Sequence, residues 1–135
     1  VLWPGSLQPA KTADNNDSLV LRLETGSETL LLTGDIERPV ELTLSEGGAS
    51  LGADFLAIAH HGSRTSTTEP FFGSVHPRFA AISVGGNNPF GHPNDDVVQR
   101  IEAAGAHLYR TDRDGAITVF TDGKRMDVHP FLTRE

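Results

Sequence analysis

The sequence of 135 residues contains no cysteine, which excludes disulfide bonds and thiolate metal sites. It has no apolar run approaching the roughly 18 residues of a membrane span. Its first residues do not have the pattern of a signal peptide. Basic residues are few, since 11 Lys and Arg stand against 18 Asp and Glu, for a net charge of −7. Because a surface that holds nucleic acid by charge alone is basic, any chemistry on a phosphodiester would need bound cations.

The composition that remains is typical of one globular domain with a core, at 37% hydrophobic and 21% charged residues. The chain does not begin with Met, and we expect an excised or processed piece. Residues 1–17 are rich in Pro, Asn and Asp and predict an irregular lead-in, in which Trp3 and Pro4 are packing residues.

Apolar periodicity predicts strands that alternate with helices. A first hairpin is predicted from 18–24 and 28–32, and Val40 and Leu44 mark the buried side of a helix. Asn94 is the predicted N-cap of a later helix and Gly105 its C-cap. Further strands are predicted at 54–59, 79–84, 107–110, 116–120 and 125–129, and helices at 37–46, 67–75 and 94–105. This order indicates a layered α/β fold, which usually places its chemistry after strand ends.

Asp35 directly follows a predicted strand and Gly34. A carboxylate in this position can point into a cleft, and Asp is a hard ligand that is able to bridge two cations. The alternative is a turn carboxylate or a cap for the helix that follows.

Two adjacent imidazoles begin the segment HHGSRTS, residues 60–66, after an apolar strand. Successive residues of a strand point opposite ways, so one imidazole can reach a metal while the other orients it or contacts substrate. Gly62 permits close backbone approach, and Ser63, Arg64 and the later hydroxyls suit a phosphate. The alternative is one core histidine and one surface histidine.

His92 ends the Gly/Asn/Pro-rich segment GGNNPFGHP, residues 85–93. It is either a substrate-contacting or acid/base residue near a helix start, which favours anions, or part of a structural turn. Arg110 and Thr111 either hold a phosphate or belong to a charged turn in which Asp112 pairs with Arg113. His76, His107 and His129 have no partners by spacing and are predicted to be surface or structural residues.

Two other kinds of site have no support in the sequence. It contains neither a phosphate-binding glycine loop with lysine nor a GxSxG nucleophile elbow. Nothing in the spacing supports a Ser–His–Asp triad built on Ser63.

The strings TGD, HHGSRTS, SVGGNNPFGHP and YRTDRDG, in this order, resemble the ComEC competence protein family over residues 15–122. The resemblance implies that residues 1–135 are a partial domain, the C-terminal half of a metallo-β-lactamase-like αββα sandwich. It implies that Asp35 is a metal-bridging aspartate and that His61, which precedes Gly62, is a metal ligand supported by His60. Which of the two histidines is the ligand stays open.

By the same resemblance, His60, His92 and Ser63 would position a phosphate or protonate the leaving oxygen. Asn87 and Arg110 are weaker candidates for the same cleft. The cofactor would be a divalent metal, zinc or manganese, with two ions in the complete domain. The family's HxHxDH motif is absent, so either the first half lies outside this sequence or the chain is a degenerate member, and we expect the isolated chain to be inactive.

The implied function of the complete domain is a metal-dependent phosphodiesterase or nuclease that acts on DNA during uptake. The alternatives are a non-catalytic module that guides DNA or serves assembly, and a hydrolase of the same fold with another small substrate. The expected partners are DNA, the upstream half of the domain, a membrane channel and a second copy of the chain. The parent would lie in the cell membrane, with this domain soluble on the outer face of the cytoplasmic membrane.

Overall fold

The structure is a computed structural model that describes residues 1–5 and 13–132, so residues 6–12 of the predicted lead-in lie outside the described residues. Strands and helices alternate as the periodicity predicts. The strands are β1 (Leu21–Thr25), β2 (Glu28–Leu32), β3 (Phe55–Ala57), β4 (Phe79–Ile82), β5 (His107–Arg110), β6 (Ile117–Thr121) and β7 (Met126–Pro130). The helices are α1 (Arg38–Glu46), α2 (Glu69–Val75), α3 (Asp95–Ala103) and α4 (Thr111–Asp114), with 3-10 turns η1 (Asn15–Asp17) and η2 (Ala59–Gly62).

The main sheet has the order β1-β2-β3-β4-β5. Strands β1 and β2 form the predicted antiparallel hairpin, whereas β2 to β5 run parallel. The carboxyl ends of these four strands therefore meet at one edge of the sheet. Strands β6 and β7 form a separate antiparallel hairpin, and its turn meets the β1–β2 turn, where Ser27 N donates to Gly123 O at 2.7 Å.

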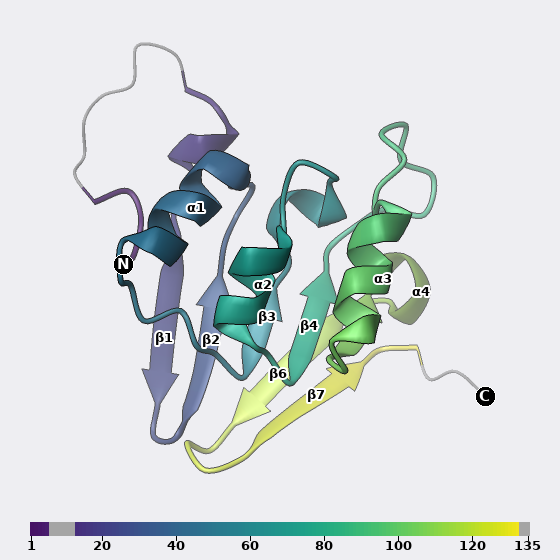
Figure 1. Ribbon diagram of the computed structural model, residues 1–135. Helices are drawn as coiled ribbons and strands as arrows, with labels where there is room; N and C mark the ends of the chain where they lie inside the picture. Colours follow the sequence, from purple (N-terminus) through teal and green to yellow (C-terminus); the bar gives the residue numbers. More distant parts are fainter. Residues whose placement is uncertain (6–12, 133–135) are drawn as a thin grey trace.

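The core lies between the sheet and three helices. Figure 1 shows α1, α2 and α3 over one face of the sheet. Leu31, Leu56 and Ala80 are paired neighbours on adjacent strands and are almost completely buried, and Val40 and Leu44 of α1 are buried as predicted. Strand residues one position away face the opposite side, where Leu23 is 45% exposed. The helices thus cover one face of a mixed α/β fold.

The ends of several elements differ from the predictions because local contacts stop the strands early. The first strand begins at Leu21 rather than residue 18, since Ser18 is the C-cap of the 3-10 turn η1 and Val20 forms only an isolated bridge with Trp3. Strand β3 ends at Ala57 because the backbone turns at η2. Residues 111–114 form a helical turn rather than a β-turn.

The predicted caps of α3 are close to those in the structure. Asn94 is the N-cap, and its side chain accepts a hydrogen bond from Asp96 N. The C-cap is Ala104, and Gly105 follows it with a φ of +80°. Within residues 1–5 and 13–132, no helix is long and apolar enough to cross a membrane.

Candidate functional site

The loops after β2, β3 and β4 bring four of the five predicted site residues to the carboxyl edge of the sheet. His61 Nε2 lies 3.6 Å from Asp35 Oδ1. The His60 ring centroid is 6.3 Å from that of His61 and 5.7 Å from that of His92. We call Asp35, Glu37, His60, His61 and His92 the carboxyl-edge cluster. The structure therefore assembles side chains that are up to 57 residues apart in sequence, from 35 to 92.

Both adjacent histidines lie in a left-handed turn rather than on a strand. The φ angles of His60, His61 and Gly62 are +48°, +55° and +78°. This conformation costs a residue other than glycine about 1–2 kcal/mol. Hydrogen bonds from His60 N to Gly34 O (3.1 Å) and from Ser63 N to His60 O (2.9 Å) hold the turn. The strand alternation assumed for the two imidazoles was wrong, because β3 ends before them; their backbone strain is of a kind that clusters at functional sites.

A neighbouring hydrogen bond decides which ring nitrogen of His61 carries the hydrogen in its contact with Asp35. His61 Nδ1 lies 2.7 Å from the carbonyl oxygen of Ser83, an acceptor, so Nδ1 carries the hydrogen. In the neutral ring the Nε2 lone pair then faces the Asp35 carboxylate. Two electron-rich atoms at this separation repel each other unless a proton or a cation stands between them. The side chains are 49% and 43% exposed, so solvent ions can reach the pair.

Glu37 contacts the other histidine, and the sequence reasoning missed it as a site residue. His60 Nδ1 is 3.2 Å from Glu37 Oε1 but does not complete a hydrogen bond. Thr65 Oγ1 donates to the same oxygen at 2.8 Å, and Glu37 N donates to Asn16 Oδ1 at 3.0 Å. The available signal was a second acidic residue two positions after Asp35, which was assigned only to the start of a helix.

The lead-in before β1 also reaches the cluster. Asn15 Nδ2 lies 3.4 Å from His60 Nε2, and Ser18 Oγ accepts from Asp35 N at 3.0 Å. Trp3 is partly buried against the core, as predicted, and its Nε1 donates to Asn16 O at 2.7 Å. These contacts tie the Asn15–Asp17 turn and Ser18 to both acidic residues of the cluster.

His92 is partly buried next to the other imidazoles. Burial lowers the pKa of His92 below its usual 6.5, and the positive charge of protonated His60 and His61 lowers it further. The uncharged ring is therefore favoured near neutral pH, a form that can accept a proton. The segment after it is fixed, since Asn94 N donates to Gly62 O at 2.8 Å.

The remaining predicted residues either make contacts outside the carboxyl-edge cluster or are exposed. Ser63 is 6% exposed and its hydroxyl lies 3.0 Å from Thr65 Oγ1, within its own loop. The guanidinium of Arg110 donates to both carboxylate oxygens of Asp112, at 3.0 and 2.6 Å. The predicted pairing of Asp112 with Arg113 was therefore wrong. Thr111 Oγ1 accepts from Val84 N and donates to Val84 O. Asn87, His76, His107 and His129 are all exposed.

The catalytic and metal-binding roles assigned to Asp35, His60, His61, Ser63 and His92 stay predictions. Among residues 1–5 and 13–132, no group of three or more His, Asp or Glu side chains is arranged to hold a metal ion. The cluster instead contains two carboxylate–imidazole pairs. One pair is Asp35 with His61, and the other is Glu37 with His60.

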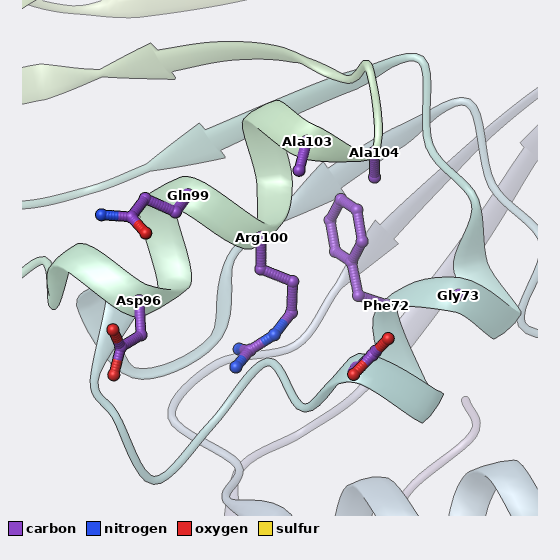
Figure 2. A pocket seen from close by; sticks show the side chains of 8 residues that line it. Phe72, Gly73, Asp96, Gln99, Arg100, Ala103 and Ala104 are labelled. Carbon is purple, nitrogen blue, oxygen red and sulfur yellow. The ribbon is translucent and has the colours of Figure 1, made fainter.

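A hollow of about 570 Å³ lies between α2 and α3. Phe72, Asp96 and Arg100 line it (Figure 2), together with Glu69. Arg100 Nη1 donates to Thr67 O at 2.7 Å, so one of its N–H groups is already used. No residue of the carboxyl-edge cluster lines this hollow, and it is separate from the candidate site.

Comparison with known proteins gives relatives with informative names. The chain is 40% identical to ComE operon protein 3 of Bacillus subtilis over 117 residues, 87% of this chain and 15% of that protein. It is 40% identical to competence protein ComA of Neisseria gonorrhoeae over 105 residues, 77% of this chain and 15% of that protein. These relatives support a competence-protein family for this chain.

A more distant relative agrees with this family. Recombination protein 2 of Haemophilus influenzae is 33% identical over 123 residues, which are 90% of this chain and 15% of that protein. No family model matches the sequence. The chain spans about 15% of the length of each of the three relatives named above.

Proposed function

We propose that this chain is part of a metal-dependent phosphodiesterase or nuclease that acts on DNA during competence-related uptake. The observation that carries the proposal is the contact of His61 Nε2 with Asp35 Oδ1 at the carboxyl edge. The names of the relatives from Bacillus subtilis and Neisseria gonorrhoeae support the competence context.

The donor atoms of Asp35 and His61 fit a divalent cation. Two ligand atoms that each lie about 2.0–2.1 Å from the same tetrahedral zinc are about 3.4 Å from each other. The separation of 3.6 Å between Nε2 and Oδ1 is close to this value. The Ser83 carbonyl that accepts from Nδ1 is the kind of partner that orients a metal-binding histidine. Imidazole suits zinc and carboxylate suits manganese, so both metals are candidates.

Each residue of the cluster has a distinct proposed role. Asp35 and His61 would hold the metal, which would supply Lewis acidity and lower the pKa of a bound water. His60, which lies beside the Glu37 carboxylate, would contact the phosphate. His92, uncharged near neutral pH, would exchange a proton with an oxygen of the substrate. Ser63 would support the loop rather than touch substrate, because its hydroxyl is buried.

The second face of the sheet supports the more specific proposal of a metallo-β-lactamase-like αββα sandwich. The helices cover one face, and the other face presents partly exposed apolar side chains, among them Leu21, Leu23 and Leu32. Another sheet with its own helices would bury this surface and supply the remaining metal ligands. We propose that an upstream half of the parent protein does so, with a second copy of the chain as the alternative. The parent would lie in the cell membrane beside a channel, with this domain on the outer side.

The test is metal content after dialysis against zinc or manganese, measured by elemental analysis. Asp35→Ala and His61→Ala should each lower the bound metal, because each removes one of two donors. Matched controls are Asp127→Ala and His129→Ala, which change exposed residues of the same types in β7. The controls should retain the wild-type metal content.

Equal metal in the site variants and the controls would refute the proposed ligands.

A second function is favoured by one observation, the lack of a three-ligand group among the described residues. This alternative is a non-catalytic module that guides DNA. It predicts DNA affinity that falls steeply with salt and does not change when metal is chelated.

A further inference from the structure

Phe90 lies in the loop between β4 and α3, two residues before His92, and is 76% exposed. A single exposed aromatic residue is common on protein surfaces. Its ring, however, stacks on that of His92, with centroids 5.9 Å apart and an angle of 24° between the planes. His92 in turn meets His60 edge to face at 5.7 Å. A continuous series of rings therefore runs from solvent to the carboxyl-edge cluster.

The loop that presents Phe90 is braced by one amide side chain. Asn88 Nδ2 donates to Gly85 O at 2.8 Å and to His92 O at 2.7 Å. Its Oδ1 accepts from Phe90 N at 3.2 Å and from His92 N at 3.0 Å. Both donors and both acceptor sites of the amide are used, and all four bonds lie within the loop. The backbone at Phe90 is thus held in place before any ligand arrives, which lowers the cost of binding.

Both ends of the same loop are anchored to neighbouring elements. At the start, Val84 N donates to Thr111 Oγ1 at 2.7 Å. At the end, Pro93 packs against Gly62, where an added Cβ would lie 2.6 Å from Pro93 Cβ. Through this contact the loop is fixed relative to the left-handed turn that carries His60 and His61.

The charge of the chain limits how it can hold a nucleic acid. Its net charge of −7 opposes binding of the phosphate backbone by charge alone. An aromatic ring binds a nucleobase by stacking, which needs no charge on the protein and tolerates any base. A base in the interior of a duplex is already covered on both faces, so only an unpaired or terminal base can use such a ring.

We propose that Phe90 is a stacking platform for an unpaired nucleobase of single-stranded DNA, whose neighbouring phosphate lies at the carboxyl-edge cluster. The phosphate side of this inference rests on the proposed function. The base side rests on the exposure of Phe90, its stacking on His92 and the bracing by Asn88. The ring selects strands with free bases, which makes Phe90 a specificity-determining residue.

The experiment is binding of an oligothymidine of about eight nucleotides with one central 2-aminopurine. Fluorescence quenching reports stacking of that base, and titration gives the Kd, with manganese and with EDTA. Phe90→Ala and Phe90→Leu should raise the Kd by about 5- to 150-fold and remove the quenching. Phe90→Trp should keep both. Phe131→Ala, at a residue that is 79% exposed, is the control and should match the wild type.

Four results would each overturn the inference: no binding by the wild type, an unchanged Kd in Phe90→Ala, wild-type quenching in Phe90→Leu, or equal affinity for the same oligonucleotide inside a blunt duplex. A retained Kd in Phe90→Leu would overturn it as well, because it would indicate an apolar contact of the kind that protein partners make. The metal content of Asp35→Ala and His61→Ala, which does not depend on a nucleobase, tests the proposed function separately. Wild-type metal content in both variants, with Phe90-dependent binding intact, would refute the proposed metal ligands and leave the stacking platform standing.

Discussion

Glu41 tests how the segment after the left-handed turn is held in place. Its side chain is completely buried in α1, and its two carboxylate oxygens accept from the backbone N–H groups of Thr67 and Thr68. Replacing Glu41 by Ala removes both acceptors. A buried N–H without a partner costs about 1–3 kcal/mol, so the variant should lose about 2–6 kcal/mol of unfolding free energy. Whole domains have only about 5–15 kcal/mol.

The assay is urea unfolding followed by far-ultraviolet circular dichroism, with Glu46→Ala as the matched control. Glu46 is exposed on the same helix, and its replacement should change the unfolding free energy by less than about 0.5 kcal/mol. A loss in Glu41→Ala that is no larger than in Glu46→Ala would refute the reasoning, because it would mean that the two N–H groups find other partners.

The Glu41 carboxyl also predicts in which direction the unfolding free energy changes with pH. Burial raises the pKa of Glu41 above its usual 4.5, although the Thr68 and Thr67 hydrogen bonds and Arg100 oppose the shift. A raised folded pKa means that the folded state holds the proton more tightly, so this contribution to stability is present at low pH. It is lost as the pH rises from about 4.5 through the folded pKa. Since Glu41→Gln cannot titrate, the unfolding free energy of the wild type minus that of the variant should fall across this interval.

Three further results are expected. Gly62→Ala should lower the unfolding free energy by about 2 kcal/mol or more, because Gly62 has a φ of +78° and an added Cβ would meet Pro93. Urea unfolding of this variant that is unchanged from the wild type would contradict this. Arg110→Lys should cost about 1–2 kcal/mol in the same assay, since lysine cannot donate both bonds of the fork to Asp112, and an equally stable variant would show that the fork contributes nothing. In the metal-free chain, the NMR titration midpoint of His92 should lie below 6.5, because burial and the neighbouring imidazoles lower its pKa. The contribution of His92 to stability should then fall as the pH drops from 6.5 through that midpoint, and a midpoint at or above 6.5 would be inconsistent with the observed packing.

Much of the architecture follows from local patterns in the chain. The turn after Thr25 and the alternation around it predict the β1–β2 hairpin, and Asn94 predicts the start of α3, since both depend on residues close in sequence. The strand at His107–Arg110 has the predicted bounds. The motifs also mark which loops contribute to the candidate site, because Asp35, the histidine pair and His92 all follow apolar strands.

The arrangement of the site depends on tertiary contacts that span long stretches of sequence. Parallel pairing of β2, β3 and β4 brings three distant loops together, and the partners in such pairing cannot be read from local periodicity. The left-handed turn at His60 and His61 overrides the local preference of both residues, because one hydrogen bond to Gly34 O and the packing of Gly62 on Pro93 hold it. The composition and motifs alone determine an acidic α/β domain with candidate ligands; only the folded chain decides that Asp35 faces His61, since that contact joins the ends of two separate strands.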